Sequence, residues 1–188
     1  GTYMDQESLE LMSEKKIPLV PTFTFQANLI DYAEQMGASK DYKEIFQKEI
    51  QDNAEMFRKA FDAGIPFLCG SESGFSVTPY GDWHYRELEV FVTQLGLTPL
   101  EAITCATKNA ALAMKKENEL GLIAPGYLAD LIIVDGDPAK DVTLLGNKDL
   151  IKHVILDGKE IDLTPQPKRL KDPDGWRISS YSSRILEK

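Results

Sequence analysis

The sequence predicts an α/β protein with a parallel sheet, and a repeated order of elements carries this prediction. Twice the chain runs from an amphipathic helical pattern through a short turn into Ile-Pro and an apolar, strand-like segment, at residues 17–23 and 65–70. Their apolar composition suits strands covered on both faces. Two consecutive helix–strand units favour parallel strands joined by helices. A doubly wound sheet and a closed barrel both remain open on this pattern.

Capping residues and apolar periodicity predict the two helices of these units. Asp5 can cap a helix that runs to about residue 16. The second helix begins at Ser39 or Asp41, has apolar residues at spacings of three and four, and ends at Gly64. Each apolar segment therefore follows a helix, as a parallel α/β unit requires.

The second half of the chain starts with a helix and then becomes rich in strands. Thr98 offers an N-cap, Pro99 suits the first helical position and Glu101 can close a capping box, so a helix is expected to about residue 116. Beyond it we expect turns at Pro125-Gly126 and Asp157-Gly158, and strands at residues 120–123, 129–134 and 152–156. These changes divide the chain into an α/β part at residues 1–118, a β-rich part at 119–163 and an extended tail at 164–188.

Composition excludes several classes of function. The chain has 188 residues, 43% hydrophobic and 27% charged, which is typical of a globular protein, and its net charge of −9 argues against nucleic-acid binding. No apolar run is long enough to span a membrane. Cys69 and Cys105 lack metal-ligand or disulfide spacing. We therefore expect a cytoplasmic protein in a reducing compartment, with a small molecule as its substrate.

Chemistry is expected in the loops after Phe23 and Gly70, because sites of parallel α/β proteins lie at the carboxyl ends of the strands. The loop G-S-E-S-G at residues 70–74 places Glu72 between two glycines. Glu72 is either a metal-binding or proton-transferring carboxylate or part of a polar turn. A serine-hydrolase elbow is excluded, because Glu72 occupies the position of the nucleophile in G-x-S-x-G.

His84 is the second candidate, in a long loop over a strand end. This loop, residues 75–85, is rich in aromatic and ionisable residues. Together with Ser73 and Tyr80, His84 is a candidate for contact with the substrate, and a packed loop histidine is the alternative. Glu72 and His84 alone would leave a catalytic zinc short of ligands. A structural or surface role is expected for His153.

Five motifs stand out along the chain: G-S-E-S-G at 70–74, W-H-Y-R-E-L at 83–88, G-L-T-P-L-E-A at 96–102, A-T-K-N-A-A at 106–111 and G-Y-L-A-D-L-I-I-V-D-G-D-P at 126–138. Together they resemble the C-terminal part of the amidohydrolase superfamily, especially its imidazolonepropionase-like and Xaa-Pro-dipeptidase-like branch. The resemblance covers Gly1 to about Leu163, and residues 126–138 are its most specific part.

The resemblance implies a (β/α)8 TIM-type barrel with one or two divalent metals, most often zinc, and a small β-sandwich built from both chain ends. This chain would supply the C-terminal part of both, with residues 17–23 and 65–70 as the last two barrel strands. Glu72 stands where the family has a metal-binding, proton-accepting aspartate. Residues 1–5 resemble the stretch that follows the family's last metal-binding histidine, so the other ligands are expected outside this chain.

The resemblance therefore implies a metal-dependent hydrolase of amide, peptide or cyclic C–N bonds that uses metal-activated water. The chain alone is expected to be an inactive fragment that needs a missing N-terminal segment or a partner chain, and to form a homo-oligomer. The alternative is a non-catalytic binding or assembly module that keeps the fold without the metal. Metal analysis of the complete protein discriminates between the two.

Overall fold

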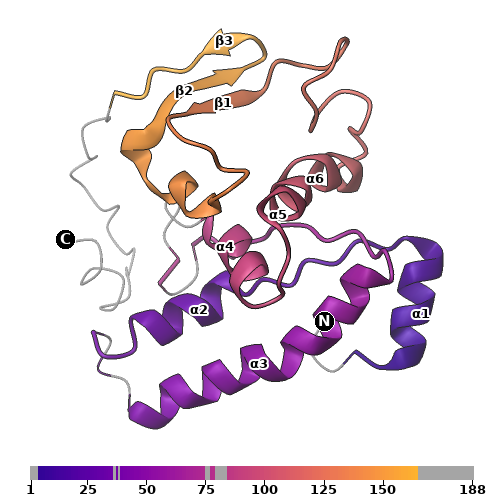
Figure 1. The fold of residues 1–188 in the computed structure, drawn as a ribbon, viewed down its shortest axis with the longest axis vertical. Helices are drawn as coiled ribbons and strands as arrows, with labels where there is room; N and C mark the ends of the chain where they lie inside the picture. Colours follow the sequence, from indigo (N-terminus) through magenta and orange to yellow (C-terminus); the bar gives the residue numbers. More distant parts are fainter. Residues whose placement is uncertain (1–3, 36, 38, 75–76, 79–83, 165–188) are drawn as a thin grey trace, which may run out of the picture.

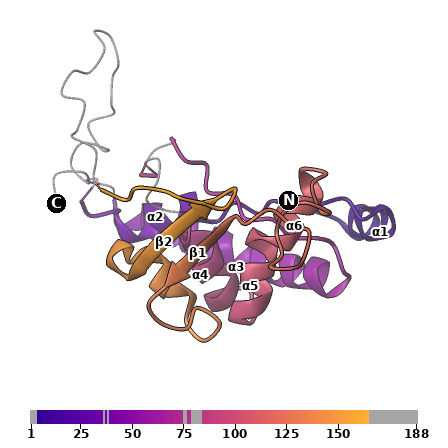
Figure 2. The ribbon, with the colours of Figure 1, turned by 90° about the horizontal axis from the view of Figure 1, so that it is seen from above.

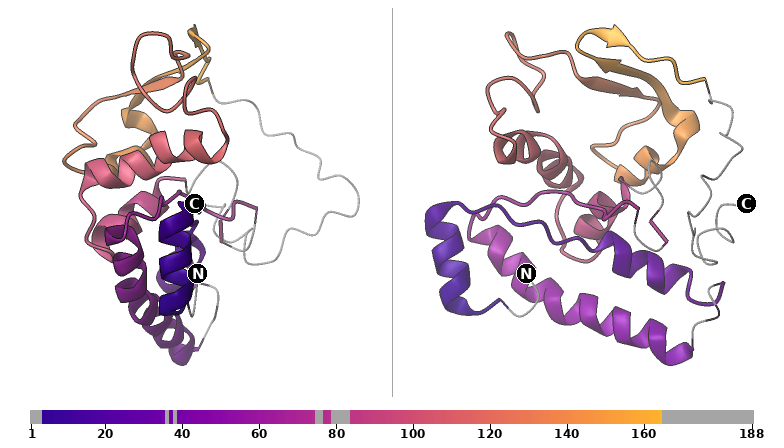
Figure 3. Two further views of the ribbon diagram at one scale, coloured as in Figure 1. Left: turned by 90° about the vertical axis from the view of Figure 1, so that its right-hand side faces the viewer. Right: turned by 180° about the vertical axis from the view of Figure 1, so that it is seen from behind.

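The computed structural model describes residues 4–35, 37, 39–74, 77–78 and 84–164. Its helices are α1 (Gln6–Lys15), α2 (Thr24–Asp31), α3 (Lys40–Asp62), α4 (Arg86–Thr93), α5 (Pro99–Ala106) and α6 (Lys108–Ala113). Its strands are β1 (Leu131–Val134), β2 (Ile151–Leu156) and β3 (Lys159–Glu160). Figure 1 shows α1, α2 and α3 at one end of the molecule and the sheet at the other. Figure 3 shows α5 and α6 between the sheet and α3.

The two apolar segments lie side by side and run in the same direction, as predicted. The Leu19 amide donates to the Pro66 carbonyl at 2.9 Å, and the Leu68 amide donates to the Leu19 carbonyl at 2.9 Å. Their regular pairing amounts to one parallel bridge, Leu19 to Phe67, so the strands predicted over residues 17–23 and 65–70 were too long. Prolines within both segments remove amide donors from the ladder, which explains the short pairing.

The prediction that these segments are covered on both faces was wrong for this chain. Leu19 and Phe23 are buried, whereas Val20 between them is 44% exposed. The buried face packs on a cluster of phenylalanine rings around Phe67, which is fully buried. The rings of Phe57, Phe61 and Phe91 meet the Phe67 ring edge-on, with centroids 6.2, 5.6 and 5.9 Å away. This cluster fixes the parallel pair to α3 and α4.

The predicted helices are mostly present. Asp5 caps α1 by accepting a hydrogen bond from the Ser8 amide, and α3 follows Ser39. The helix predicted from Thr98 to about residue 116 is broken at Thr107, so that α5 and α6 are separate. The Thr107 hydroxyl donates to the Ile103 carbonyl within α5, a contact that bends helices. A side chain at Gly121 would lie 2.8 Å from the Thr107 carbonyl oxygen, so the following turn packs tightly against this break.

The β-rich part forms a three-stranded antiparallel sheet in the order β1-β2-β3, and β1 and β2 run side by side in Figure 2. The hairpin between β2 and β3 turns at Asp157-Gly158, as predicted, with positive φ at both residues. The strand predicted at residues 120–123 is absent: the amides of Glu119 and Leu120 donate to the Lys116 carbonyl, which coils the chain in turns.

None of the helices in the described residues combines the length and apolar character needed to cross a membrane.

The capping box of α5 provides a test of local stability. The Thr98 hydroxyl accepts from the Glu101 amide, and the Glu101 carboxylate accepts from the Thr98 amide. Thr98→Ala should therefore lower the free energy of unfolding by about 1 kcal/mol in urea titrations. Thr104→Ala is the matched control, because the Thr104 hydroxyl only donates to a carbonyl within the helix. Equal losses in both variants would show that the box does not stabilise α5.

Candidate functional site

The loop that carries Glu72 folds back on itself directly after the second apolar segment. Glu72 and Gly74 both have positive φ, at 48° and 98°. The Gly74 amide donates to the Thr78 carbonyl at 2.7 Å, and the Thr78 hydroxyl donates to the Glu72 carbonyl at 3.0 Å. Thr78 is fully buried. Thr78 therefore holds the backbone of Glu72 and Gly74 across the loop.

Glu72 borders a cavity of about 400 Å³ at the carboxyl ends of the parallel pair. Its side chain is exposed. The residues that follow the first apolar segment form another wall of this cavity, and α3 contributes Phe46, Glu49, Asn53 and Phe57. A carboxylate at this end of a parallel pair agrees with the position expected for a site in such a fold.

The two strand ends approach each other very closely at Gly70. A Cβ atom at this position would lie 2.5 Å from Cγ1 of Val20. Two residues further along the first segment, Thr22 has φ of 60°, a conformation that β-branched residues rarely adopt. Backbone strain of this kind concentrates at functional sites, where the surrounding structure holds it in place.

The structure brings Ser73 and His84 together, the two predicted substrate-contacting residues that it describes. The Ser71 hydroxyl lies 2.7 Å from the Ser73 hydroxyl and 3.2 Å from Nδ1 of His84. His84 is exposed. Because Nδ1 is engaged, Nε2 is the ring nitrogen with which His84 could contact a ligand. Tyr80, the third predicted contact, lies outside the described residues.

Sequence reasoning missed Glu87, a fully buried carboxylate on α4. Its Oε1 accepts from the Phe23 amide at 2.9 Å, and its Oε2 accepts from the Thr24 amide and hydroxyl, each at 2.7 Å. These donors lie at the start of α2, which has no side-chain cap of its own. Burial raises the pKa of the Glu87 carboxyl from 4.5 to about 7, and the hydrogen bonds from Phe23 and Thr24 act in the opposite direction.

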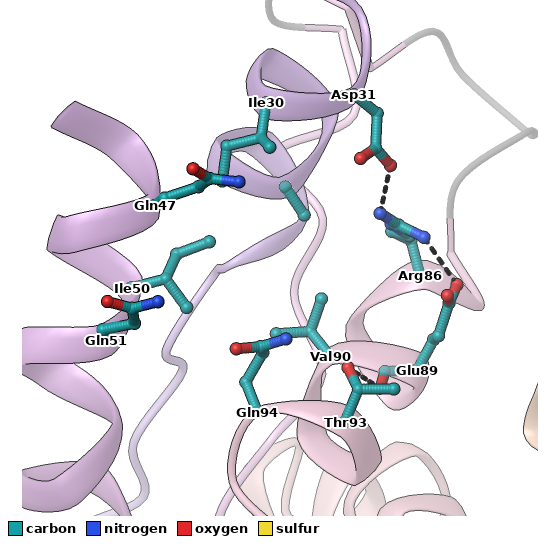
Figure 4. A pocket seen from close by; sticks show the side chains of 11 residues that line it. Ile30, Asp31, Gln47, Ile50, Gln51, Arg86, Glu89, Val90, Thr93 and Gln94 are labelled. Atoms are coloured by element: carbon teal, nitrogen blue, oxygen red, sulfur yellow. Dashed lines mark hydrogen bonds and ion pairs between the residues drawn. The ribbon is translucent and has the colours of Figure 1, made fainter. Parts of the chain in front are cut away.

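Arg86, the neighbour of Glu87, binds the other end of α2. Its guanidinium pairs with Asp31 at the end of α2 and, at 2.8 Å, with Glu89 of its own helix (Figure 4). These side chains line a cleft of about 270 Å³ between α2, α3 and α4. Because Arg86 is paired with two carboxylates, its charge stabilises the fold here. Consecutive residues of α4 thus hold both ends of α2.

Within the part of the chain that the structure describes, the cysteines and His153 form no catalytic cluster. Among the residues that the structure describes, no three His, Cys, Asp or Glu side chains are close enough together to bind a metal ion. Burial raises the pKa of the Cys69 thiol far above its ordinary range, and raises that of Cys105 to about 12. Both thiols are therefore protonated at neutral pH and neither is an active nucleophile. His153 lies on the sheet surface, 2.5 Å from Glu160.

The raised pKa of Glu87 makes a prediction about stability. A carboxyl whose folded-state pKa is raised adds stability that is fully present below pH 4.5 and is lost as pH rises through about 7. Relative to Glu87→Gln, the wild-type chain should therefore lose on the order of 3 kcal/mol of unfolding free energy across this window, measured by urea unfolding at a series of pH values.

Glu101→Gln is the control for this experiment. Hydrogen bonds from Thr98 lower the pKa of Glu101, so its contribution is present above pH 4.5 and is lost as pH falls. The two variants should thus show opposite dependences on pH. If the stability of wild type relative to Glu87→Gln stays constant with pH, the hydrogen bonds cancel the effect of burial; if it rises with pH, they outweigh burial.

Comparison with known proteins places these features in a family. The model of the family described as "Amidohydrolase family" matches residues 1–161. Ochratoxinase of Aspergillus niger is 31% identical over 160 residues, covering 84% of this chain and 32% of that protein. Imidazolonepropionase of Aeromonas hydrophila is 32% identical over 94 residues, covering 50% of this chain and 23% of that protein.

Solved structures give the same result. The crystal structure of A. niger ochratoxinase aligns with a TM-score of 0.69 at 29% identity, covering 85% of this chain and 35% of that chain. A Xaa-Pro dipeptidase with methionine bound in its active site aligns with a TM-score of 0.66 at 31% identity, covering 86% and 38%. This chain spans about a third of the length of the ochratoxinase that it matches. Because the family model matches most of its residues, the chain belongs to the amidohydrolase family.

Proposed function

We propose that this chain is the C-terminal part of a metal-dependent hydrolase that cleaves amide, peptide or cyclic C–N bonds with metal-activated water. The observation that carries the proposal is the position of Glu72, whose carboxylate borders the cavity at the carboxyl ends of the parallel pair. Family membership supports it, as do relatives named ochratoxinase, Xaa-Pro dipeptidase and imidazolonepropionase.

The residues described in this chain fit one part of a metal site. Glu72 offers an exposed carboxylate, a suitable ligand for zinc, at an open cavity. Since catalytic zinc usually has three protein ligands, the remaining ligands would come from elsewhere in the complete protein. We therefore propose one or two divalent ions, most often zinc, in the complete enzyme and not on this chain alone.

Within the proposed reaction each candidate residue has a distinct role. A divalent metal, when bound, polarises the scissile carbonyl and lowers the pKa of water. Glu72 accepts the proton of the attacking water and returns it to the leaving nitrogen. His84 and Ser73, joined through Ser71, contact the substrate from the side of the loop. Tyr80 is proposed as a further contact.

The division of the chain follows from the same proposal. Residues 1–118 would form the last strands and helices of a (β/α)8 barrel, residues 119–163 part of a β-sandwich and residues 164–188 an extended tail. Ile132, Ile133 and Leu156 of the sheet are each about half exposed, which supports a covering segment or a second copy of the chain. Because both cysteines are free thiols, a reducing compartment such as the cytoplasm is proposed.

The role of Glu72 is tested in the complete protein that contains this chain. Glu72→Gln keeps the shape of the side chain but removes the base, so kcat/KM for dipeptides, acyl-amino acids or cyclic amides should fall about 100- to 10,000-fold. Glu72→Asp should retain part of the activity, and Glu119→Gln, on the surface beside Lys116, should retain all of it. Absence of bound metal and of hydrolysis in the zinc-loaded wild type would instead identify a non-catalytic module.

The two histidines provide a matched pair for substrate contact. His84→Ala should raise KM about tenfold, the effect of one lost hydrogen bond, and leave kcat less affected. His153→Ala should leave both constants unchanged, because His153 lies on the sheet beside Glu160. Steady-state kinetics with the complete protein measure both. An unchanged KM in His84→Ala would assign His84 a packing role.

A further inference from the structure

The buried side chain of Asn28 connects α2 to the loop of Glu72. Asn28 is fully buried, and its Nδ2 donates to the Val77 carbonyl at 2.9 Å. Its Oδ1 is also buried and has no hydrogen-bond partner among the residues that the structure describes. An unpaired buried oxygen is destabilising, and an apolar side chain of similar size would avoid it. The favourable contribution of this side chain therefore comes from its Nδ2 donor, which binds the Val77 carbonyl.

The acceptor of this hydrogen bond is in an unusual conformation. Val77 has φ of 55°, which is rare for a β-branched residue, and its side chain is buried. The next residue, Thr78, makes the two hydrogen bonds that close the loop, one to the Glu72 carbonyl and one from the Gly74 amide. A shift of Val77 would therefore move the contacts that hold the backbone of Glu72.

α2 can hold Val77 firmly because α2 itself is fixed at both ends. Glu87 binds the start of the helix and Arg86 binds Asp31 at its end. The loop also contacts His84, three residues before Glu87, through Ser71. Both α2 and the segment at residues 84–87 therefore contact the Glu72 loop.

We infer that Asn28 is a positioning residue for Glu72: by donating to the Val77 carbonyl, it fixes the loop conformation from which the carboxylate reaches the cavity. Its effect on catalysis rests on the proposed function, whereas its effect on the loop does not. The two effects are therefore measured separately.

The first experiment measures the loop in the 188-residue chain. Asn28→Leu removes the donor at nearly constant size, and exchange of the Gly74 amide, followed by NMR, should become about tenfold faster. The amide of Ala102 in α5, which donates to the Thr98 carbonyl, is the internal reference and should not change. Asn28→Ala, which adds no atoms, replaces the leucine variant if the latter does not fold.

Asn109→Leu is the matched control, because Asn109 also donates its Nδ2 to a backbone carbonyl, that of Phe67, at 3.0 Å. It should leave exchange of the Gly74 amide unchanged. Unchanged exchange in the Asn28 variants, or equal acceleration in the Asn109 variant, would overturn the inference whatever the protein catalyses.

The second experiment measures the catalytic consequence in the complete, zinc-loaded protein. A displaced Glu72 should affect proton transfer more than binding of the substrate, so Asn28→Leu should lower kcat about 10- to 100-fold with little change in KM. Asn109→Leu should keep wild-type kinetics. A faster-exchanging loop with an unchanged kcat would refute the catalytic part, while absence of hydrolysis in the wild type would refute the proposed function and leave the result on the loop intact.

Discussion

The candidate site depends on the hydrogen bonds that the Glu87 carboxylate accepts at the start of α2. α2 begins inside the aromatic core, directly after Phe23, and has no side chain of its own to accept hydrogen bonds from its first amides. Leaving such buried donors unpaired costs about 1–3 kcal/mol each. Glu87 accepts from two of them and from the Thr24 hydroxyl. A negative charge at a helix N-terminus is also favourable. The Glu87 side chain of α4 thereby stabilises the first turn of α2.

The neighbouring residues Arg86 and Glu87 carry opposite charges and fix the two ends of α2, the helix that contacts the Glu72 loop. Arg86 binds the C-terminal end of α2, where a cation is favourable, and Glu87 binds the N-terminal end. Between these ends, Asn28 reaches Val77. Residues with positive φ, such as Thr22 and Val77, cost on the order of 1–3 kcal/mol each unless the surroundings hold them. The hydrogen bonds of Asn28 to Val77 and of Thr78 to Glu72 offset part of that cost in the loop.

Apart from the parallel pairing of the two apolar segments, the features that the sequence predicts correctly are those whose partners lie a few residues apart. The capping box of Thr98 and Glu101 and the turn at Asp157-Gly158 are of this kind, and the loop of Glu72 follows from its place after an apolar segment. α2 could not be predicted, because its cap comes from Glu87, 63 residues beyond Thr24. The contact of Ser71 with His84 likewise depends on tertiary structure. The two strands were predicted too long because their apolar composition is typical of buried strands. Their prolines lack the amide donors that a longer parallel pairing requires.

Glu87 also links local order to global stability. It ionises near neutral pH, where Glu72 would have to act as a base. The ionised carboxylate is the stronger acceptor for the amides of Phe23 and Thr24, so its hydrogen bonds to the start of α2 are strongest in this form. The same ionisation carries the cost of a buried charge, which lowers the stability of the whole fold. Ionisation of Glu87 therefore strengthens its hydrogen bonds to the start of α2 while it lowers the stability of the whole fold.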